Sequence, residues 1–291
     1  MMLPSPKLNI LVAFPYFTNY VKNFFKDLDP NTFRLIIDSG AYSVYNSNKK
    51  VDMNDYITFL KDIPKQWDFK AVQLDVFGDA KKTYDNLKIM LDKGLDVMPV
   101  FTRGDKLERL EEYYTYTDYI MFGGIVVGGQ NINYIKWFCE KNKGRKAHWL
   151  GFNNTKFIRY FKPESVDSST VWNGQRFGRL DLYNGHGTFY SLRRIDFENA
   201  PDTKAITLLK KLKFYDEINK LQKSEAWKGS QYYEDKKLRG LSGFINTTSH
   251  LLRAIDIEKN IGTKIYLACA NDKQLKILYE SYKHLTEKDI I

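Results

Sequence analysis

The stretch AVQLDVFGDAKKTYDNLKIMLDKGLDVMPVF, from Ala71 to Phe101, contains a complete strand–helix–strand unit. Two short apolar runs, AVQLD (71–75) and DVMPVF (96–101), have the length and composition of strands that are buried on both faces. Between them, residues 83–93 show helical periodicity, and Gly94 follows at the position where a glycine commonly ends a helix. This order predicts a βαβ unit with two parallel strands.

The same alternation recurs on both sides of this stretch. Helical periodicity is present at 54–60, which Asp52 or Asn54 would cap, and at 131–143, before Gly144. Five further apolar runs predict parallel strands: NILVAF (9–14), RLIID (34–38), YIMFGG (119–124), AHWLGF (147–152) and SVDSS (165–169). Seven such strands favour a closed (β/α)8 TIM-type barrel, an α/β fold, over an open sheet. Two segments compete for the eighth strand: GRLDLY (178–183) and KIYLACA (264–270).

Length and composition agree with a barrel. The chain has 291 residues, of which 43% are hydrophobic, enough for a sizeable core. We expect a single barrel domain over 1–291, with a basic, helix-rich elaboration at about 185–262, within or after the barrel. No run approaches the ~20 apolar residues of a membrane span, and the N-terminus lacks the basic region of a signal peptide. The two cysteines match no metal or redox spacing, so we expect a soluble cytoplasmic protein without membrane contact.

The charge favours a polyanionic partner. The formal net charge is +10, and from about Gly174 onward basic residues alternate with aromatic and aliphatic ones. Such a pattern suits phosphate contacts beside stacking faces, but amphipathic helices with solvated basic faces have it as well. The candidates for nucleic-acid contacts are Arg176, Arg179, Arg193, Arg194, Lys210, Lys211, Lys213, Lys236, Lys237 and Arg239.

Acidic residues mark the ends of three predicted strands, namely Asp38, Asp75 and Asp167. A fourth strand ends in the glycine-rich run FGGIVVGG (122–129). In a (β/α)8 barrel the carboxyl ends of the strands form the active-site face, so these features would converge there. The alternative interpretation of each acid is structural, because Asp-Ser-Gly can form an Asx-turn and a strand-end aspartate often caps the next helix.

DSGAYS, QLDVFGD, MFGGIVVGG, HWLGF and VDSST, in this order, resemble the tRNA-guanine transglycosylase family. The resemblance covers roughly residues 34–170 and is closest to the bacteriophage branch, the 7-deazaguanine DNA transglycosylases. It implies that Asp167 is the nucleophile that attacks the sugar C1′ and expels guanine. It also implies that Asp38 is the general acid and base for the leaving and entering bases. An N-glycoside exchange needs two carboxyl groups with different tasks, one as nucleophile and one as proton carrier, and retaining glycosidases use such a pair.

The resemblance also implies a set of base-binding residues. Asp75 matches the carboxylate that reads the guanine N1–H and 2-amino edge, and Tyr42 and Leu150 match the positions that sandwich the base. Gly123 and Gly124 match a backbone stretch that closely approaches the heterocycle, and we include Ser39 in the set. Carboxylates suit paired N–H donors, and glycines permit close approach to a flat ring.

Three departures from the family refine the expectation. The cysteine and histidine zinc site of the tRNA enzymes has no counterpart, and we interpret His148, His186, His250 and His284 as ordinary core or surface residues. We therefore expect no metal and no cofactor. The family's glutamine after the fourth strand is absent, since Thr102 and Arg103 follow Phe101. Gly129 occupies the place of a glutamate that serves a cationic aminomethyl base, which favours a neutral nitrile substituent.

The sequence thus predicts an enzyme, a pentosyltransferase that exchanges guanine in DNA for a free 7-deazaguanine base. The inserted base is expected to be 7-cyano-7-deazaguanine, and the protein a monomer in the host cytoplasm if a phage encodes it. Three alternatives stay open: a tRNA-guanine transglycosylase, a base-excising nucleoside hydrolase or glycosylase, and a non-catalytic nucleic-acid-binding partner subunit. The dinucleotide-binding alternative is poor, because FGGIVVGG is not GxGxxG.

Overall fold

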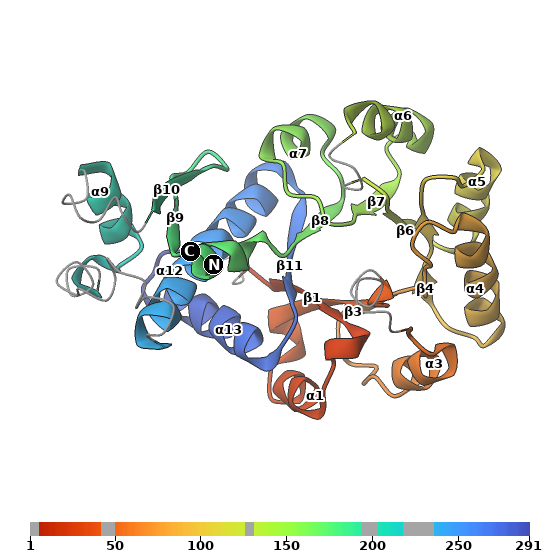
Figure 1. Ribbon diagram of the computed structural model, residues 1–291, viewed down its shortest axis with the longest axis horizontal. Coiled ribbons are helices and arrows are strands. Elements are labelled where there is room, and N and C mark those ends of the chain that lie inside the picture. Colours follow the sequence, from red (N-terminus) through yellow and green to blue (C-terminus); the bar gives the residue numbers. More distant parts are fainter. Residues whose placement is uncertain (1–5, 42–49, 126–130, 194–202, 218–235) are drawn as a thin grey trace, which may run out of the picture. The chain divides into compact units, whose positions relative to one another are not determined.

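The computed structural model describes residues 6–41, 50–125, 131–193, 203–217 and 236–291. These residues form two compact units (Figure 1). The barrel unit comprises Lys7–Ser168 and Gly262–Asp272. The helix–hairpin unit comprises the described parts of Ser169–Ile261 and Lys273–Ile291, together with Pro6. Compact units are not the same as independently folding domains, so the single-domain expectation stays a prediction.

The barrel unit is an α/β TIM-like barrel, as the sequence predicts. Its parallel strands follow the order β4-β3-β2-β1-β11-β8-β7-β6-β5. The strands are β1 (Leu8–Ala13), β2 (Phe33–Asp38), β3 (Phe69–Val72), β4 (Val97–Met98), β5 (Val100–Phe101), β6 (Tyr119–Phe122), β7 (Lys146–Trp149), β8 (Ser165–Ser168) and β11 (Lys264–Cys269). Because β4 and β5 are separated only by Pro99, they act as one interrupted strand whose first half pairs with β3 and whose second half pairs with β6. This interrupted strand closes the ring.

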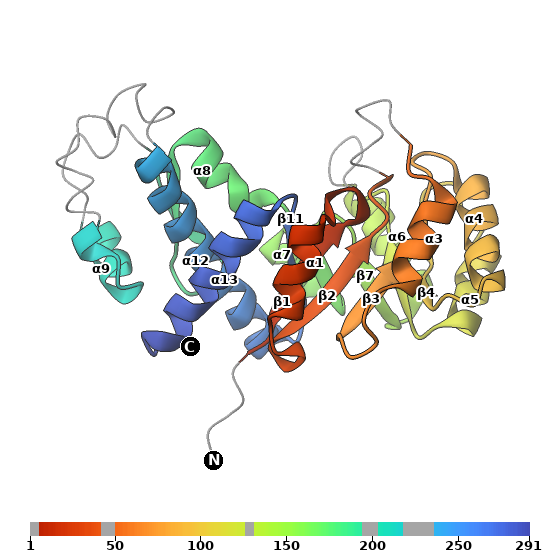
Figure 2. The same ribbon diagram turned by 90° about the horizontal axis from the view of Figure 1, so that it is seen from below.

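Helices cover the outside of this ring (Figures 1 and 2). They are α1 (Asn19–Lys26), α3 (Met53–Lys61), α4 (Ala80–Asp92), α5 (Leu107–Tyr116), α6 (Ile132–Asn142) and α7 (Thr155–Phe161). Except at α5, a side chain at the N-terminus accepts from free backbone N–H groups, and Asp52 does this for α3 by accepting from Asn54 and Asp55. Gly94 follows α4 with φ of +73°, as its predicted helix-ending position requires.

The barrel interior is filled by side chains that alternate along the strands. Leu11, Ile36, Val72, Met98, Val100, Met121 and Tyr266 form one buried cluster. Since successive side chains of a strand point to opposite faces, the residues two positions beyond these also face inward. Asp38 follows Ile36 by two positions, and Asp167 pairs in register with Tyr266. The interior alternation therefore carries both acids to the inside of the barrel.

The structure settles two points that the sequence left open or placed differently. KIYLACA forms the eighth strand, β11, between β1 and β8, whereas GRLDLY forms an antiparallel hairpin strand in the other unit. The strand predicted over 71–75 is shorter, because β3 ends at Val72. Beyond Val72 the backbone N–H groups of Leu74 and Val76 donate to Met90 Sδ and Thr83 Oγ1. Asp75 consequently lies in a loop that these side chains hold in place.

The helix–hairpin unit contains most of the predicted basic segment. The hairpin strands β9 (Arg179–Tyr183) and β10 (Phe189–Arg193) pair in an antiparallel manner. The helices of this unit are α8 (Asn173–Phe177), α9 (Thr203–Lys211), α12 (Lys236–Ile261) and α13 (Asp272–Glu287). Buried polar side chains join α12 to β9, since Asn246 Oδ1 accepts from the N–H of Asp181 at 2.7 Å. Among the described helices of the chain, none combines the length and the apolarity that a membrane span requires.

Candidate active site at the carboxyl ends of the barrel strands

Asp38 is the last residue of β2 and is half-buried. Its Oδ2 accepts a hydrogen bond from the N–H of Gly40 at 3.0 Å, which is the local turn that Asp-Ser-Gly predicts. Gly40 has φ of +80°, and a Cβ on it would lie 2.4 Å from Pro15 Cδ. Only glycine fits this position, so the DSG motif fixes the direction in which the Asp38 carboxyl group leaves the strand.

Ser39, the residue after Asp38, links Asp75 to the end of β2 by a hydrogen bond. The buried Ser39 hydroxyl donates to Asp75 Oδ1 at 2.7 Å and accepts from the N–H of Ala41 at 3.2 Å. The phenolic hydroxyl of Tyr56 donates to Val72 O at 2.7 Å, which ties α3 to the end of β3. Burial raises the pKa of Tyr56, and the charges of Asp38 and Asp75 raise it further. The two acids therefore share one electrostatic environment.

The environment of Asp38 favours its protonated form. Burial raises the pKa of Asp38 from its ordinary value of 3.8 to about 7, helped by the negative charges of Asp75 and Asp167. Hydrogen bonds from the N–H groups of Gly40 and Ser39 oppose this increase. Burial also raises the pKa of Asp75, against the hydrogen bond from Ser39. A carboxyl group that titrates near neutral pH can both donate and accept a proton during a reaction.

Asp167 lies on β8 and is held by two donors. Its Oδ1 accepts from the N–H of Gly151 at 2.7 Å and lies 3.1 Å from His148 Nε2. Gly151 directly follows Leu150, at the end of β7, so the loop after β7 bonds to the acid on the neighbouring strand. Within the described residues, both hydrogen bonds of this carboxylate converge on Oδ1. Oδ2 is then the oxygen that has lone pairs available for chemistry.

A buried polar chain continues behind Asp167, and reasoning from the sequence assigned it no role. His148 and Ser165 are both fully buried and pair in register on β7 and β8. His148 Nδ1 lies 2.5 Å from Ser165 Oγ, which is also hydrogen-bonded to the hydroxyl of Tyr119. His148 is a core residue, as predicted, but it also contacts the candidate nucleophile. The available signal was the spacing of two between His148 and Leu150, which places both on the interior face.

Glycines and Leu150 line the neighbouring strand ends. A Cβ on Gly123 would lie 3.6 Å from Leu150 Cδ1, so these two predicted base-binding residues are adjacent. Gly124 has φ of +70°, and a Cβ there would lie 3.2 Å from Thr102 Oγ1 and 3.3 Å from Arg103 Cγ. The backbone at Gly124 therefore passes close to the loop that follows β5, and a larger residue would separate the two segments.

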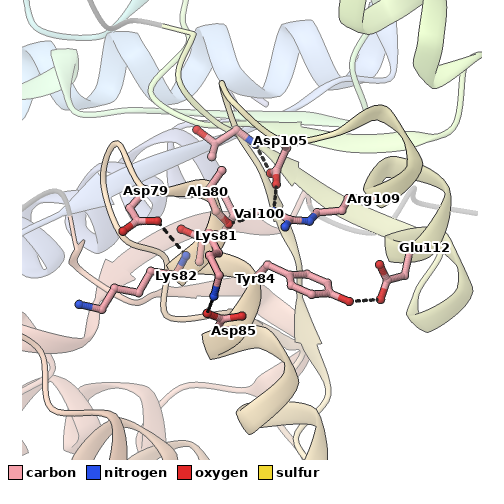
Figure 3. Close-up of polar contacts among 12 residues, drawn as sticks. Asp79, Ala80, Lys81, Lys82, Tyr84, Asp85, Val100, Asp105, Arg109 and Glu112 are labelled. Carbon is pink, nitrogen blue, oxygen red and sulfur yellow. Dashed lines mark hydrogen bonds and ion pairs between the residues drawn. The ribbon is translucent and has the colours of Figure 1, made fainter.

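An ion pair between Asp105 and Arg109 anchors the loop after β5 (Figure 3). Asp105, whose side chain is fully buried, accepts from the N–H of Thr102 at 3.1 Å and from Arg109 Nη1 at 2.8 Å. Arg109 also donates to Ala80 O at 3.2 Å, and its guanidinium lies over the ring of Tyr84. These contacts join α4 and α5 and hold the segment against which Gly124 packs.

The remaining predicted residues fall outside this cluster. Tyr42 and Arg194 lie outside the described residues, as does Gly129. The other basic candidates belong to the helix–hairpin unit, where all but Arg179 are exposed. Arg179 Nη2 donates to the buried Asp181 at 2.9 Å. Although burial opposes it, the nearby His250, whose Nε2 lies 3.9 Å from Asp181 Oδ2, and hydrogen bonds from Arg179 and Ser191 lower the pKa of Asp181 to about 2. Arg179 thus neutralises a buried acid.

The other histidines have ordinary structural positions. His186 is exposed, His250 is buried beside Asp181, and His284 lies 2.8 Å from Leu212 O while stacking on Phe214. Over the described parts of the chain, no three metal-ligating side chains gather into a group that would hold an ion. Metal-free function stays a prediction.

Comparisons with known proteins add little to this geometry. No family model matches the chain, and no solved structure matches it. The chain is similar to "Uncharacterized protein 306" of Sulfolobus islandicus rod-shaped virus 1, with 24% identity over 199 residues. The match covers 63% of this chain and 63% of the viral protein, so the chain spans less than two thirds of that relative's length. The fold and the site therefore define only a class of protein, an α/β barrel with acidic residues at the ends of its strands.

Proposed function

We propose that this protein is a transglycosylase that exchanges guanine in DNA for a 7-deazaguanine base through a covalent aspartyl-glycosyl intermediate. One observation carries the proposal. Asp38 and Asp167, from strands far apart in the sequence, lie within electrostatic range at one end of the barrel, and their environments differ. Asp38 has a pKa of about 7, whereas Asp167 accepts two hydrogen bonds at one oxygen. Retaining glycoside chemistry requires such a pair, one proton carrier and one nucleophile.

In the first displacement, Asp167 Oδ2 attacks C1′ of the target nucleoside. The C1′–Oδ2 bond forms while the bond from C1′ to the guanine nitrogen breaks, and the bonding electrons leave with the base. Protonated Asp38 delivers its proton to the departing guanine, so the base leaves neutral. A pKa of about 7 keeps a substantial fraction of Asp38 protonated at neutral pH.

In the second displacement, the reaction runs in reverse with another base. Asp38, now ionised, takes the N–H proton of the incoming 7-deazaguanine, whose nitrogen attacks C1′. The C1′–Oδ2 bond breaks and Asp167 leaves as a carboxylate. The Asp75 carboxylate is suited to accept the paired N–H donors of both the leaving and the entering guanine-type edge, and Ser39 fixes its position. Gly123 and Leu150 offer a close backbone and an apolar contact to the ring.

The helix–hairpin unit supports a nucleic-acid substrate. Arg176, Lys236, Lys237 and Arg239 are exposed, and Gln175 Nε2 donates to Arg239 O at 2.8 Å, which joins α8 to the first turn of α12. Phe177 is 60% exposed, and the Arg176 guanidinium lies 5.5 Å from its ring centroid. An exposed aromatic ring among cations suits phosphate contacts and base stacking. A guanine in duplex DNA must leave the stack, at a cost of a few kcal/mol, which such contacts help to offset.

The test is base exchange with labelled substrates. DNA and, separately, tRNA that carry labelled guanine are incubated with each 7-deazapurine base, and label release and product nucleosides are measured. Asp167→Asn should abolish exchange while binding persists, and Asp38→Asn should lower the rate about 10²–10⁴-fold. Asp79→Asn is the matched control, because Asp79 caps the nearby helix α4 and asparagine caps equally well. Full exchange by Asp167→Asn would refute the assignment of the nucleophile.

The same experiment separates the alternatives. Release of guanine without incorporation of a new base would identify a hydrolase or glycosylase. Activity on tRNA alone would identify the RNA-modifying reaction, and binding without release would identify a non-catalytic subunit.

The choice of base is a separate hypothesis that rests on Gly129 in the sequence. Without a carboxylate at this place, a cationic aminomethyl group would lack a partner, and a nitrile would be accepted more readily. Binding measurements with 7-cyano- and 7-aminomethyl-7-deazaguanine decide between them. A clear preference for the amine would contradict the hypothesis.

A further inference from the structure

We propose that His148 is a positioning residue for Asp167, fixed by a buried hydrogen-bond chain so that Oδ1 stays anchored and Oδ2 performs the covalent chemistry. The inference deepens the proposed function and rests on it. It concerns the side of Asp167 that faces the barrel core, where His148 and Ser165 are fully buried.

The chain of donors has a definite direction. Asp167 Oδ1 is a carboxylate oxygen that can only accept, so His148 Nε2, 3.1 Å away, must carry the hydrogen. The proposal assigns a hydrogen to Nε2 alone, so that Nδ1 accepts from the Ser165 hydroxyl, whose oxygen lies 2.5 Å away. Ser165 Oγ in turn accepts from the Tyr119 hydroxyl, which burial keeps protonated by raising the pKa of Tyr119. Every proton in this chain has an acceptor.

Packing holds the imidazole ring in this orientation. The ring of His148 meets that of Tyr266 edge-on, with centroids 5.7 Å apart. The residue pairs His148–Ser165 and Asp167–Tyr266 are in register across three neighbouring strands, so the backbone fixes their relative heights. A side chain that is oriented at both nitrogens and along its edge has little freedom to turn away.

The two donors on Oδ1 act differently on the two displacements. They stabilise a full negative charge more than the oxygen of an ester, because hydrogen bonds to charged groups are the stronger ones. When Asp167 leaves C1′ in the second displacement, its charge returns and both donors regain strength. The loss of the His148 donor should therefore slow the resolution of the covalent intermediate, about tenfold or more.

The variants His148→Phe and His148→Gln separate positioning from packing. Phenylalanine has a similar shape and no donor, whereas the glutamine amide can reach the same oxygen. With His148→Phe we expect kcat to fall about tenfold or more, KM for the free base to stay within about twofold, and the protein–DNA adduct to persist longer after denaturing quench. His148→Gln should recover most of kcat. An unchanged kcat in His148→Phe, or equal defects in both variants, would overturn the inference.

A spectroscopic measurement tests this relay, the buried hydrogen-bond chain from Tyr119 through Ser165 and His148 to Asp167, without any turnover. In ¹⁵N-histidine-labelled protein, one of the four histidines should have a hydrogen on Nε2 and none on Nδ1, and its signal should be missing in His148→Gln. Ser165→Ala removes the donor to Nδ1 and should shift the Nδ1 signal, whereas the hydrogen stays on Nε2 because Asp167 Oδ1 still accepts it. A His148 that carries its hydrogen on Nδ1 would overturn the relay. If wild-type protein releases no guanine from any nucleic acid, the proposed function fails, whereas the tautomer still decides the relay.

Discussion

The raised pKa of Asp38 predicts an unusual dependence of stability on pH. In the unfolded chain Asp38 titrates near 3.8, and in the folded protein near 7. A carboxyl group with a raised folded-state pKa contributes stability that is fully present below 3.8 and is lost as pH rises through about 7. The substitution Asp38→Asn removes this titration, so the variant should gain stability over the wild type across this interval.

The magnitude follows from the two pKa values. The interval between 3.8 and about 7 corresponds to about 4 kcal/mol, at about 1.4 kcal/mol for each pH unit. Asp38 is half-buried, and solvent screens part of the cost of its charge, so we expect about 2–4 kcal/mol. For a chain of this size, such a change moves the midpoint of thermal unfolding by roughly 5–10 °C.

Thermal unfolding of wild type and Asp38→Asn at pH 4, 6 and 8 measures this effect. The midpoint difference in favour of the variant should be smallest at pH 4, grow at pH 6 and level off above pH 7. Asp62→Asn is the control, because the exposed Asp62 bonds to Lys22 at 2.7 Å and this bond lowers its pKa. Its effect should be small and of opposite sign. A difference between Asp38→Asn and wild type that stays constant from pH 4 to 8 would refute the account of the Asp38 environment.

Three further predictions concern the site's supports and the basic unit. Gly124→Ala should lower the free energy of unfolding by about 2 kcal/mol or more and weaken base binding. Gly94→Ala is the control, because Gly94 has φ of +73° but no atom near its Cβ. It should cost about 1 kcal/mol and leave base binding unchanged. Arg109→Met removes the ion-pair partner of the buried Asp105 carboxylate and should destabilise the protein by about 3 kcal/mol, measured by thermal unfolding at pH 7. Lys81→Met breaks the exposed pair with Asp85 and should cost less than about 1 kcal/mol. Lys210→Glu should weaken DNA binding and leave the affinity for the free base unchanged. The slope of log affinity against log salt should fall by roughly one for each phosphate that is no longer neutralised. A salt slope equal to that of wild type would exclude Lys210 from the interface.

The sequence predicted the barrel because its local signals agree with its tertiary structure. Strands buried on both faces are short continuous apolar runs, and the helices between them have capping side chains such as Asp52. The eighth strand was ambiguous because GRLDLY and KIYLACA are both apolar runs. Their patterns differ, since Arg179 and Asp181 alternate with leucines in the hairpin strand, whereas β11 is apolar from Ile265 to Cys269. Alternation is typical of an antiparallel strand with one polar face.

The relay behind Asp167 shows what the sequence could not provide. The alternation of side chains predicts that His148 faces inward with Leu150, and Ser165 with Asp167. Whether the histidine meets the acid depends on the register between β7 and β8, which pairs His148 with Ser165. Register arises from the packing of a whole barrel and is invisible in two isolated runs of five or six residues. The end of β3 was also not predictable from the sequence. The run AVQLD indicated Asp75 as a strand-end acid, although β3 ends at Val72, three residues before it.

The strand order determines which residues lie between the two acids on the wall of the barrel. In the ring, β1 and β11 separate β2, which carries Asp38, from β8, which carries Asp167. At the inner face, β1 contributes Ala13, in register with Asp38, and β11 contributes Tyr266, in register with Asp167, and then Ala268, in register with Leu11. A methyl group therefore lies beside Asp38 on β1, whereas an aromatic ring lies beside Asp167 on β11. The charge of Asp167 acts on Asp38 across these two intervening strands. Because Ala13 is in register with Asp38, we expect a bulky residue at position 13 to weaken the effect of the Asp167 charge on Asp38.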